Sequence, residues 1–184
     1  TEQLEEVKDI KENLIEKFLD TLNEADRDEV GVAQLTDQLS SMTRKAEELN
    51  SRAVEYSVLA TQELITSMSE STIRNEKSIR DTYNIMDKMG LLLVQESNNL
   101  KRRRHLTSYY SNSPTFNTYR SSMDSIHSLS MDLAVPFTED VEMIAESSRI
   151  ITTASSGTED GTTSVLLEPL TSLESIIAIN SSAE

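Results

Sequence analysis

The sequence predicts an all-α protein built from long amphipathic helices, and three observations lead to this prediction. Only four glycines and three prolines occur in 184 residues, which leaves few of the turns that a sandwich, a barrel or a doubly wound sheet needs. Aromatic residues make up 4% of the chain, whereas a large compact core normally uses more of them. The third observation is a regular spacing of apolar residues through the first half of the chain.

This spacing alternates between three and four residues from Leu4 to Glu63, and we call these 18 positions the heptad seam. Fourteen of the 18 are apolar, against 36% of the whole chain, which is typical of a coiled coil or an elongated helical bundle. The best stretch supplies the predicted partner-interface residues, which are Val32, Leu35, Leu39, Met42, Leu49 and Tyr56.

Beyond Ala60 the apolar pattern shifts its register. The shifted stripe consists of Val58, Ile65, Met68, Ile79, Met86, Met89 and Leu93. A single rod from residue 2 to residue 105 would be about 150 Å long. The alternative is a chain that breaks between Asp26 and Gly31 and again near Gly90, and we expect at least one such reversal. Charged residues on the seam, such as Lys11, are expected to specify register or partner.

The composition divides the chain near residue 106. Residues 1–106 are expected to form the long helical region, 107–121 a loop, and 122–184 an acidic, Ser/Thr-rich region with short amphipathic helices. The last 78 residues contain 27 Ser or Thr and all three prolines. Three helices are expected there: one carrying Met123, Ile126, Leu129 and Leu133, one beginning at Glu139 and Asp140, and one beginning at Pro169.

The net charge of -15 argues against binding to nucleic acid. The chain has no cysteine, so it has no disulfide or thiolate metal site. Its longest apolar run, Met89–Val94, is six residues, far short of the ~20 that span a bilayer. We therefore expect a protein without a membrane span, in the cytoplasm, with a nuclear or a secreted location as alternatives.

Two motifs in the sequence are candidate binding sites. Residues 26–37 have the acidic and glycine spacing of part of an EF-hand loop, but Val30 stands at the fifth position and supplies no side-chain oxygen. We therefore expect no metal and no cofactor. The second motif is the basic cluster Lys101, Arg102, Arg103 and Arg104. It is either a nuclear-localisation or docking patch for an acidic partner, or a set of cations that stabilises the dipole and the unpaired carbonyl groups at a helix C-terminus.

Catalysis finds little support in the sequence. His105 and His127 are the only histidines, and no nucleophile elbow, phosphate-binding loop or zinc-protease motif occurs. We therefore expect a protein that is not an enzyme.

Residues 103–108 and 121–124 resemble kinase substrate contexts.

The leading hypothesis is a non-enzymatic helical interaction protein, a structural or scaffolding subunit that assembles through the heptad seam as a homo- or hetero-oligomer. One alternative is a regulatory phosphoprotein or adaptor, of a transcriptional or viral polymerase type, whose acidic second half binds a partner. A second alternative is a helical secreted or surface adhesin, for which the sequon at Asn180 would accept glycan.

Overall fold

The computed structural model of the chain describes residues 2–22, 28–70, 75–104, 113–133, 141–145, 148–154 and 163–169. These residues are predominantly helical, as expected. The helices are α1 (Glu2–Leu22), α2 (Glu29–Met42), the short 3₁₀ helix η1 (Ala46–Glu48), α3 (Ser51–Glu70), α4 (Glu76–Arg104) and α5 (Pro114–Leu133). The strands are β1 (Val141–Ile144), β2 (Ser148–Ala154) and β3 (Thr163–Pro169).

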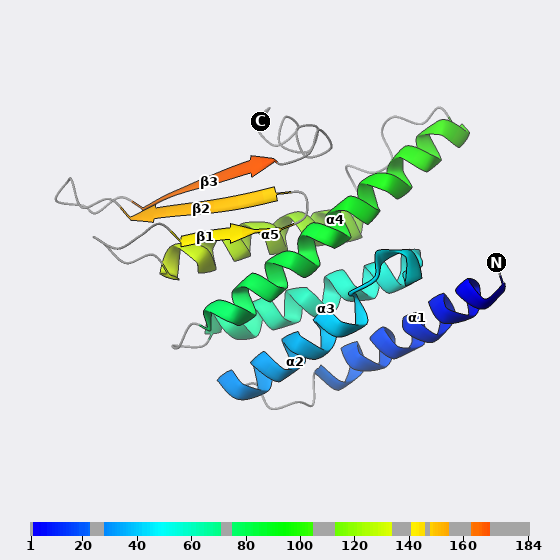
Figure 1. Cartoon of the computed structure of the whole chain (residues 1–184), viewed down its shortest axis with the longest axis horizontal. Coiled ribbons are helices and arrows are strands. Elements are labelled where there is room, and N and C mark those ends of the chain that lie inside the picture. The colour runs from blue at the N-terminus through cyan, green and yellow to red at the C-terminus, as the bar shows by residue number, and fades with distance from the viewer. Residues whose placement is uncertain are drawn as a thin grey trace.

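Helix α3 lies at the centre of the bundle and contacts α1, α2, α4 and α5. The sheet and α1–α2 lie on opposite sides of the molecule, with the other helices between them (Figure 1). All seven side chains of the shifted stripe are buried in the core. The chain also reverses between α1 and α2, where the sequence predicted a break.

Hydroxyl side chains occupy part of this core. Ser57 and Thr61 on α3 are fully buried, and each donates a hydrogen bond to the backbone carbonyl four residues earlier, at 2.6 Å and 2.8 Å. Thr36 on α2 does the same at 2.8 Å. A buried hydroxyl that is satisfied within its own helix avoids most of the desolvation cost. Small Ser and Thr residues therefore allow the helices to approach α3 closely.

The helices begin at polar residues that cap them. Asp28 accepts a hydrogen bond from the Gly31 backbone N–H at 2.7 Å, and Asn50 accepts one from Ala53 at 2.9 Å. The caps of α4 and α5 are Asn75 and Ser113. Because such caps satisfy backbone N–H groups that have no intrahelical acceptor, they fix where each helix starts.

One prediction about the helices of the second half is wrong. The segment expected to form a helix from Glu139 contains strands β1 and β2. The helix expected from Pro169 lies outside the described residues, because Pro169 is the last residue of β3 and of the described part of the chain. The three strands form an antiparallel sheet in the order β1-β2-β3, with Met143 opposite Ile150. The β-branched run from Ile150 to Thr153 explains the strand, because these side chains favour a pleated, half-buried surface.

Two further expectations about helix boundaries were wrong. The predicted loop 107–121 gives way to α5 at Pro114, where proline is well suited to the first helical turn. Helix α4 runs through Gly90 without a break. Gly90 instead faces Tyr119 of α5, and a Cβ placed on it would lie 2.7 Å from the Tyr119 Cζ atom. The glycine therefore permits α4 and α5 to approach closely.

Hydrogen bonds from buried side chains fasten the sheet to the helices. Ser148 on β2 donates to the Asp87 carboxylate of α4 at 2.6 Å, and the Tyr83 hydroxyl bonds to the same Ser148 oxygen. On the α5 side, the Ser130 and Thr152 hydroxyls are 3.0 Å apart. Hydrogen bonds to a buried carboxylate are stronger than neutral ones. The Asp87–Ser148 contact is therefore expected to be the main polar link between α4 and the sheet.

We predict that Gly90→Ala lowers the free energy of unfolding by about 1–3 kcal/mol, because the added methyl group overlaps the Tyr119 ring. Urea unfolding followed by circular dichroism measures this change. Gly31→Ala, in the first turn of α2, is the matched control and should leave stability unchanged or raise it. An increase in stability for Gly90→Ala, as helix propensity alone would give, would contradict the close approach.

We further predict that Asp87→Ala and Ser148→Ala are strongly coupled. Each change removes one partner of the same charged hydrogen bond, so the double variant should be less destabilised than the sum of the single variants by about 1–2 kcal/mol. A double-mutant cycle from urea unfolding measures this coupling. Additive effects within about 0.3 kcal/mol would show that the two side chains do not interact in solution.

Candidate functional site

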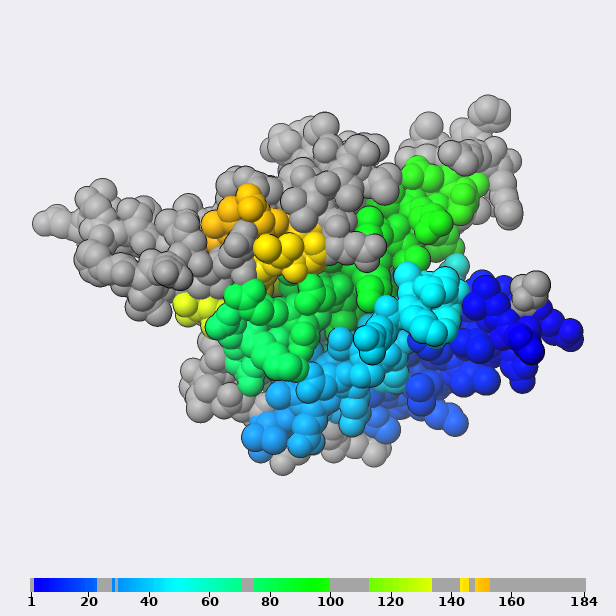
Figure 2. All heavy atoms as spheres, in the orientation of Figure 1, coloured from blue at the N-terminus to red at the C-terminus, as the bar shows by residue number. Residues whose placement is uncertain are grey.

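A groove of about 560 Å³ lies between α1 and α2, lined by Leu14, Lys17, Phe18, Thr21, Asp37, Gln38, Ser41 and Met42. Figure 2 shows these two helices, in dark and light blue, adjoining on the side of the molecule away from the sheet. Leu14 is 49% exposed and Phe18 only 7% exposed. Leu14 therefore forms a wall of the groove, and Phe18 forms part of its floor.

The apolar pattern of α1 explains why the groove is open. Helix α1 buries Ile15, Phe18 and Leu22 and packs chiefly against α3. Ile10 and Leu14, one turn apart, lie outside this stripe and are 59% and 49% exposed. We call this pair the α1 ridge. It continues the groove wall by one further turn and leaves two neighbouring apolar side chains exposed.

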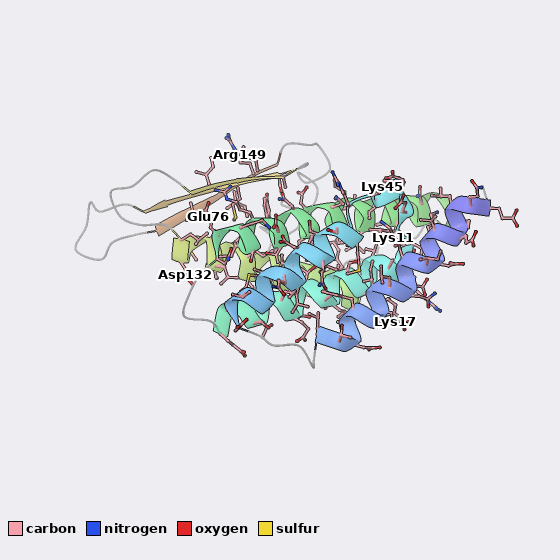
Figure 3. The ribbon with its side chains drawn as sticks, turned by 60° about the horizontal axis from the view of Figure 1, so that its bottom comes forward. Lys11, Lys17, Lys45, Glu76, Asp132 and Arg149 are labelled. Carbon is pink, nitrogen blue, oxygen red and sulfur yellow. The ribbon has the colours of Figure 1, made fainter. Side chains whose placement is uncertain are left out.

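Helix α2 is held beside α1 by cations at its C-terminal end. The Lys11 ammonium group of α1 donates to the Met42 carbonyl at 2.8 Å and pairs with Glu48 at 2.8 Å. Lys88 of α4 donates to the Arg44 carbonyl at 3.0 Å. In Figure 3 the labelled Lys11 and Lys45, both partners of Glu48, lie near each other at this end of the bundle. Cations at a helix C-terminus stabilise its unpaired carbonyl groups.

Ion pairs lie at the α2 rim of the groove. Asp37 bonds to Lys77 of α4, which also bonds to Asp81 at 2.9 Å. The hydrogen bonds that Lys77 donates, first to Asp37 and then to Asp81, raise the pKa of Lys77 to about 12. This lysine therefore stays charged at any physiological pH. On the α1 rim, Lys17 has no ion-pair partner among the described residues.

The structure distributes the predicted partner-interface residues over three segments. Helix α2 carries four of them, Leu49 follows η1, and Tyr56 lies on α3. The buried members are Val32, Leu39 and Leu49, and the half-buried members packed against the same core are Leu35, Met42 and Tyr56. Only Met42 lines the groove, where it meets the seam residues Leu14, Phe18 and Thr21.

The other sequence motifs fall at helix ends or outside the described residues. The basic cluster forms the last four residues of α4, whose end extends past the neighbouring helices in Figure 1. Residues 29–37 of the EF-hand-like spacing are helical, and Asp28 caps that helix. Of the kinase contexts, Ser121 is exposed and Ser122 buried, whereas Thr107 and Ser108 lie outside the described part of the chain.

The two histidines do not form a site together. His105 lies outside the described residues, and His127 is half-buried on α5. The Nε2 atom of His127 is buried without a hydrogen-bond partner. Burial lowers the pKa of His127, and the nearby Asp124 opposes this only in part. His127 is therefore held in its neutral form by desolvation.

The α1 ridge was missed by the sequence reasoning. The heptad seam uses one side of each helix, and Ile10 is not a seam position. A usable signal was present, because α1 carries two apolar stripes instead of one. The Ile10 and Leu14 pair lies beside the Ile15, Phe18 and Leu22 stripe, which exceeds what a helix needs for a single packing face.

No protein-family model matches this sequence, and no curated protein and no solved structure matches it. None of the described helices is long and apolar enough to cross a membrane. Within the described ranges, no group of three or more His, Asp or Glu residues is arranged to hold a metal ion.

The lowered pKa of His127 predicts a pH dependence of stability. Its ordinary pKa is 6.5 and the folded value lies below this, so the unfolded chain takes up the proton first as the pH falls. The free energy of unfolding should therefore be lower at pH 5.5 than at pH 7.5, and this loss should shrink in His127→Gln.

Urea unfolding at the two pH values measures this effect. His105→Gln is the control for histidine titration in general and should keep the full pH dependence. The carboxyl groups of Glu5 and Glu48 have lowered pKa values, so they titrate below this window. An equal loss of stability in the wild type and in His127→Gln would contradict the assignment.

Proposed function

We propose that this chain is a non-enzymatic protein-interaction module that binds an amphipathic helix of a partner protein in the groove between α1 and α2. In this proposal the bundle is a scaffold, and the groove with the α1 ridge is its docking surface. The heptad seam then serves two purposes: part of it belongs to the chain's own core, and its members Leu14, Phe18 and Met42 face the partner.

The observation that carries this proposal is the α1 ridge beside an apolar groove. Ile10 and Leu14 are about half exposed, although the chain buries residues of the same kind elsewhere. Covering apolar surface stabilises a complex by roughly 25 cal/mol for each Å² removed from water. An additional helix laid into the groove would cover both ridge residues and the exposed part of the floor.

The form of the groove favours a helix as the occupant. Its walls are two helices, and a ridge of side chains from a third helix fits the space between such walls. From Ile10 to Thr21 the α1 wall is about 16 Å long, which corresponds to two to three helical turns. An occupant with apolar residues at i, i+3, i+4 and i+7 therefore matches its length.

The lining chemistry supports binding over catalysis. No histidine or cysteine lines the groove, and Ser41, the lining serine, donates its hydroxyl to the Asp37 carbonyl at 2.9 Å. Asp37 itself bonds to Lys77. These two polar side chains are thus engaged with neighbouring protein groups, as expected for side chains that frame an apolar contact.

The test uses a synthetic helical peptide with leucines at i, i+3, i+4 and i+7 and glutamines elsewhere. We expect saturable binding by fluorescence anisotropy, with amide shifts in the NMR spectrum confined to α1 and α2. The double variant Ile10→Ser/Leu14→Ser should bind at least tenfold more weakly, because both apolar contacts are lost. Its stability should change by less than about 1 kcal/mol, since both side chains are half exposed.

Ile144→Ser is the matched control. Ile144 is 59% exposed, as is Ile10, but it lies on the sheet at the opposite side of the molecule. This variant should bind the peptide with unchanged affinity. Equal weakening by Ile144→Ser and by the ridge variant would indicate non-specific hydrophobic adhesion and would contradict the proposed function.

A further inference from the structure

We infer that the helix taken by the groove is a cationic one, with Lys or Arg residues flanking its apolar stripe. This inference rests on the proposed function and specifies the chemistry of its partner. It follows from the charges on the solvent side of α1, beside the α1 ridge. These charges form the acidic stripe, which consists of Glu2, Glu6, Asp9 and Asp20.

The acidic stripe runs along one side of α1. Steps of four, three and eleven residues separate its members, and each step returns to nearly the same direction around a helix. Glu6 precedes Ile10 by one turn, so the stripe borders the α1 ridge. All four residues are exposed. A helix lying on the ridge would therefore place one of its flanks over these carboxylates.

The carboxylates of the acidic stripe have no cationic partner in the described ranges. Other acids of the bundle are used internally: Glu12 bonds to Asn50 at 2.6 Å, and Glu16 accepts from Tyr56 at 3.0 Å. Helix α1 thus uses the acids on its inner flank to pack on α3 and leaves the acids on its outer flank unpaired. Unpaired charges at the rim of an interface set partner choice and association rate.

The remaining charges near the groove do not cancel this field. Lys17 is the one exposed cation of α1 among residues 2–22. On the α2 wall, Asp37 carries a negative charge that Lys77 balances. The solvent side of α1, with the four acids of the stripe against Lys17, is therefore net negative, on a chain whose overall charge is -15. A cationic partner would be steered towards it from beyond contact distance.

The same charges argue against a second copy of the chain as the occupant. A symmetric dimer through this face would bring two acidic stripes together, since an isologous interface uses the same patch on both subunits. Like charges facing each other across an interface disfavour association. The partner is therefore a different chain, or a different segment, with positive charge beside its leucines.

The experiment compares three peptides that share the leucine stripe and differ in their flanking residues, which are lysine, glutamine or glutamate. At low salt we expect the lysine peptide to bind at least tenfold more tightly than the glutamine peptide, and the glutamate peptide to bind most weakly. Raising the salt from 0.05 M to 0.5 M should reduce the advantage of the lysine peptide to less than threefold, because exposed charges are screened.

Charge-neutralising variants locate the effect. The triple variant Glu6→Gln/Asp9→Asn/Asp20→Asn should remove most of the preference for lysine and leave the affinity for the glutamine peptide unchanged. Glu55→Gln/Asp124→Asn, at exposed positions on α3 and α5, is the control for the lower net charge and should keep the preference.

The outcomes separate this inference from the proposed function. Equal affinities for the three peptides, with binding still weakened in the ridge variant, would overturn the inference and leave the proposed function in place. Failure of all three peptides to bind would overturn both. A mass of twice 20.6 kDa by light scattering, lost in the ridge variant, would overturn the inference in favour of a second copy.

Discussion

The carbonyl groups at the C-terminal end of α2 depend on cations from two other helices, and the arrangement of the bundle follows from this. Lys11 of α1 and Lys88 of α4 reach the carbonyls of residues 42–44. These bonds tie α2 to helices that precede and follow it in the chain, and they fix its distance from α1. The groove exists because α2 is held at this end while α1 turns its buried stripe towards α3.

The apolar periodicity identified most of the core, and it could not show where the helices end. Periodicity records which side of a helix is buried, and a reversal can preserve it. The apolar spacing of the seam therefore continues through Thr43–Asn50, although α2 ends before this segment and α3 begins after it. Asn50 and Asn75 are the local signals for the missed starts, because asparagine is a favoured N-cap. Lys11 and Asp28, read from the sequence as specifying register, bond at the two ends of α2.

The apolar pattern of the sequence could not predict the sheet or the groove, and the physical reasons differ. The expected helix after Glu139 drew on a capping residue and a few apolar positions, and strand pairing between Ile150 and Leu167 outweighed those local preferences. The candidate site depends on the spacing between two helices, which packing against α3 decides. The sequence placed Leu14, Phe18 and Met42 on the heptad seam and predicted only Met42 of these as an interface residue, and the exposure of Ile10 follows only from the packing of α1.

The central position of α3 has a consequence for how the chain can be divided. The helices that contact α3 come from both sides of the compositional boundary near residue 106. Helices α1, α2 and α4 lie before this boundary in the chain, and α5 lies after it. Tyr119, Ile126 and Leu129 of α5 belong to the same buried cluster as α3. A fragment ending at that boundary would expose this apolar surface on α3 and α4. The acidic Ser/Thr-rich half of the chain thus supplies one of the structural helices of the bundle.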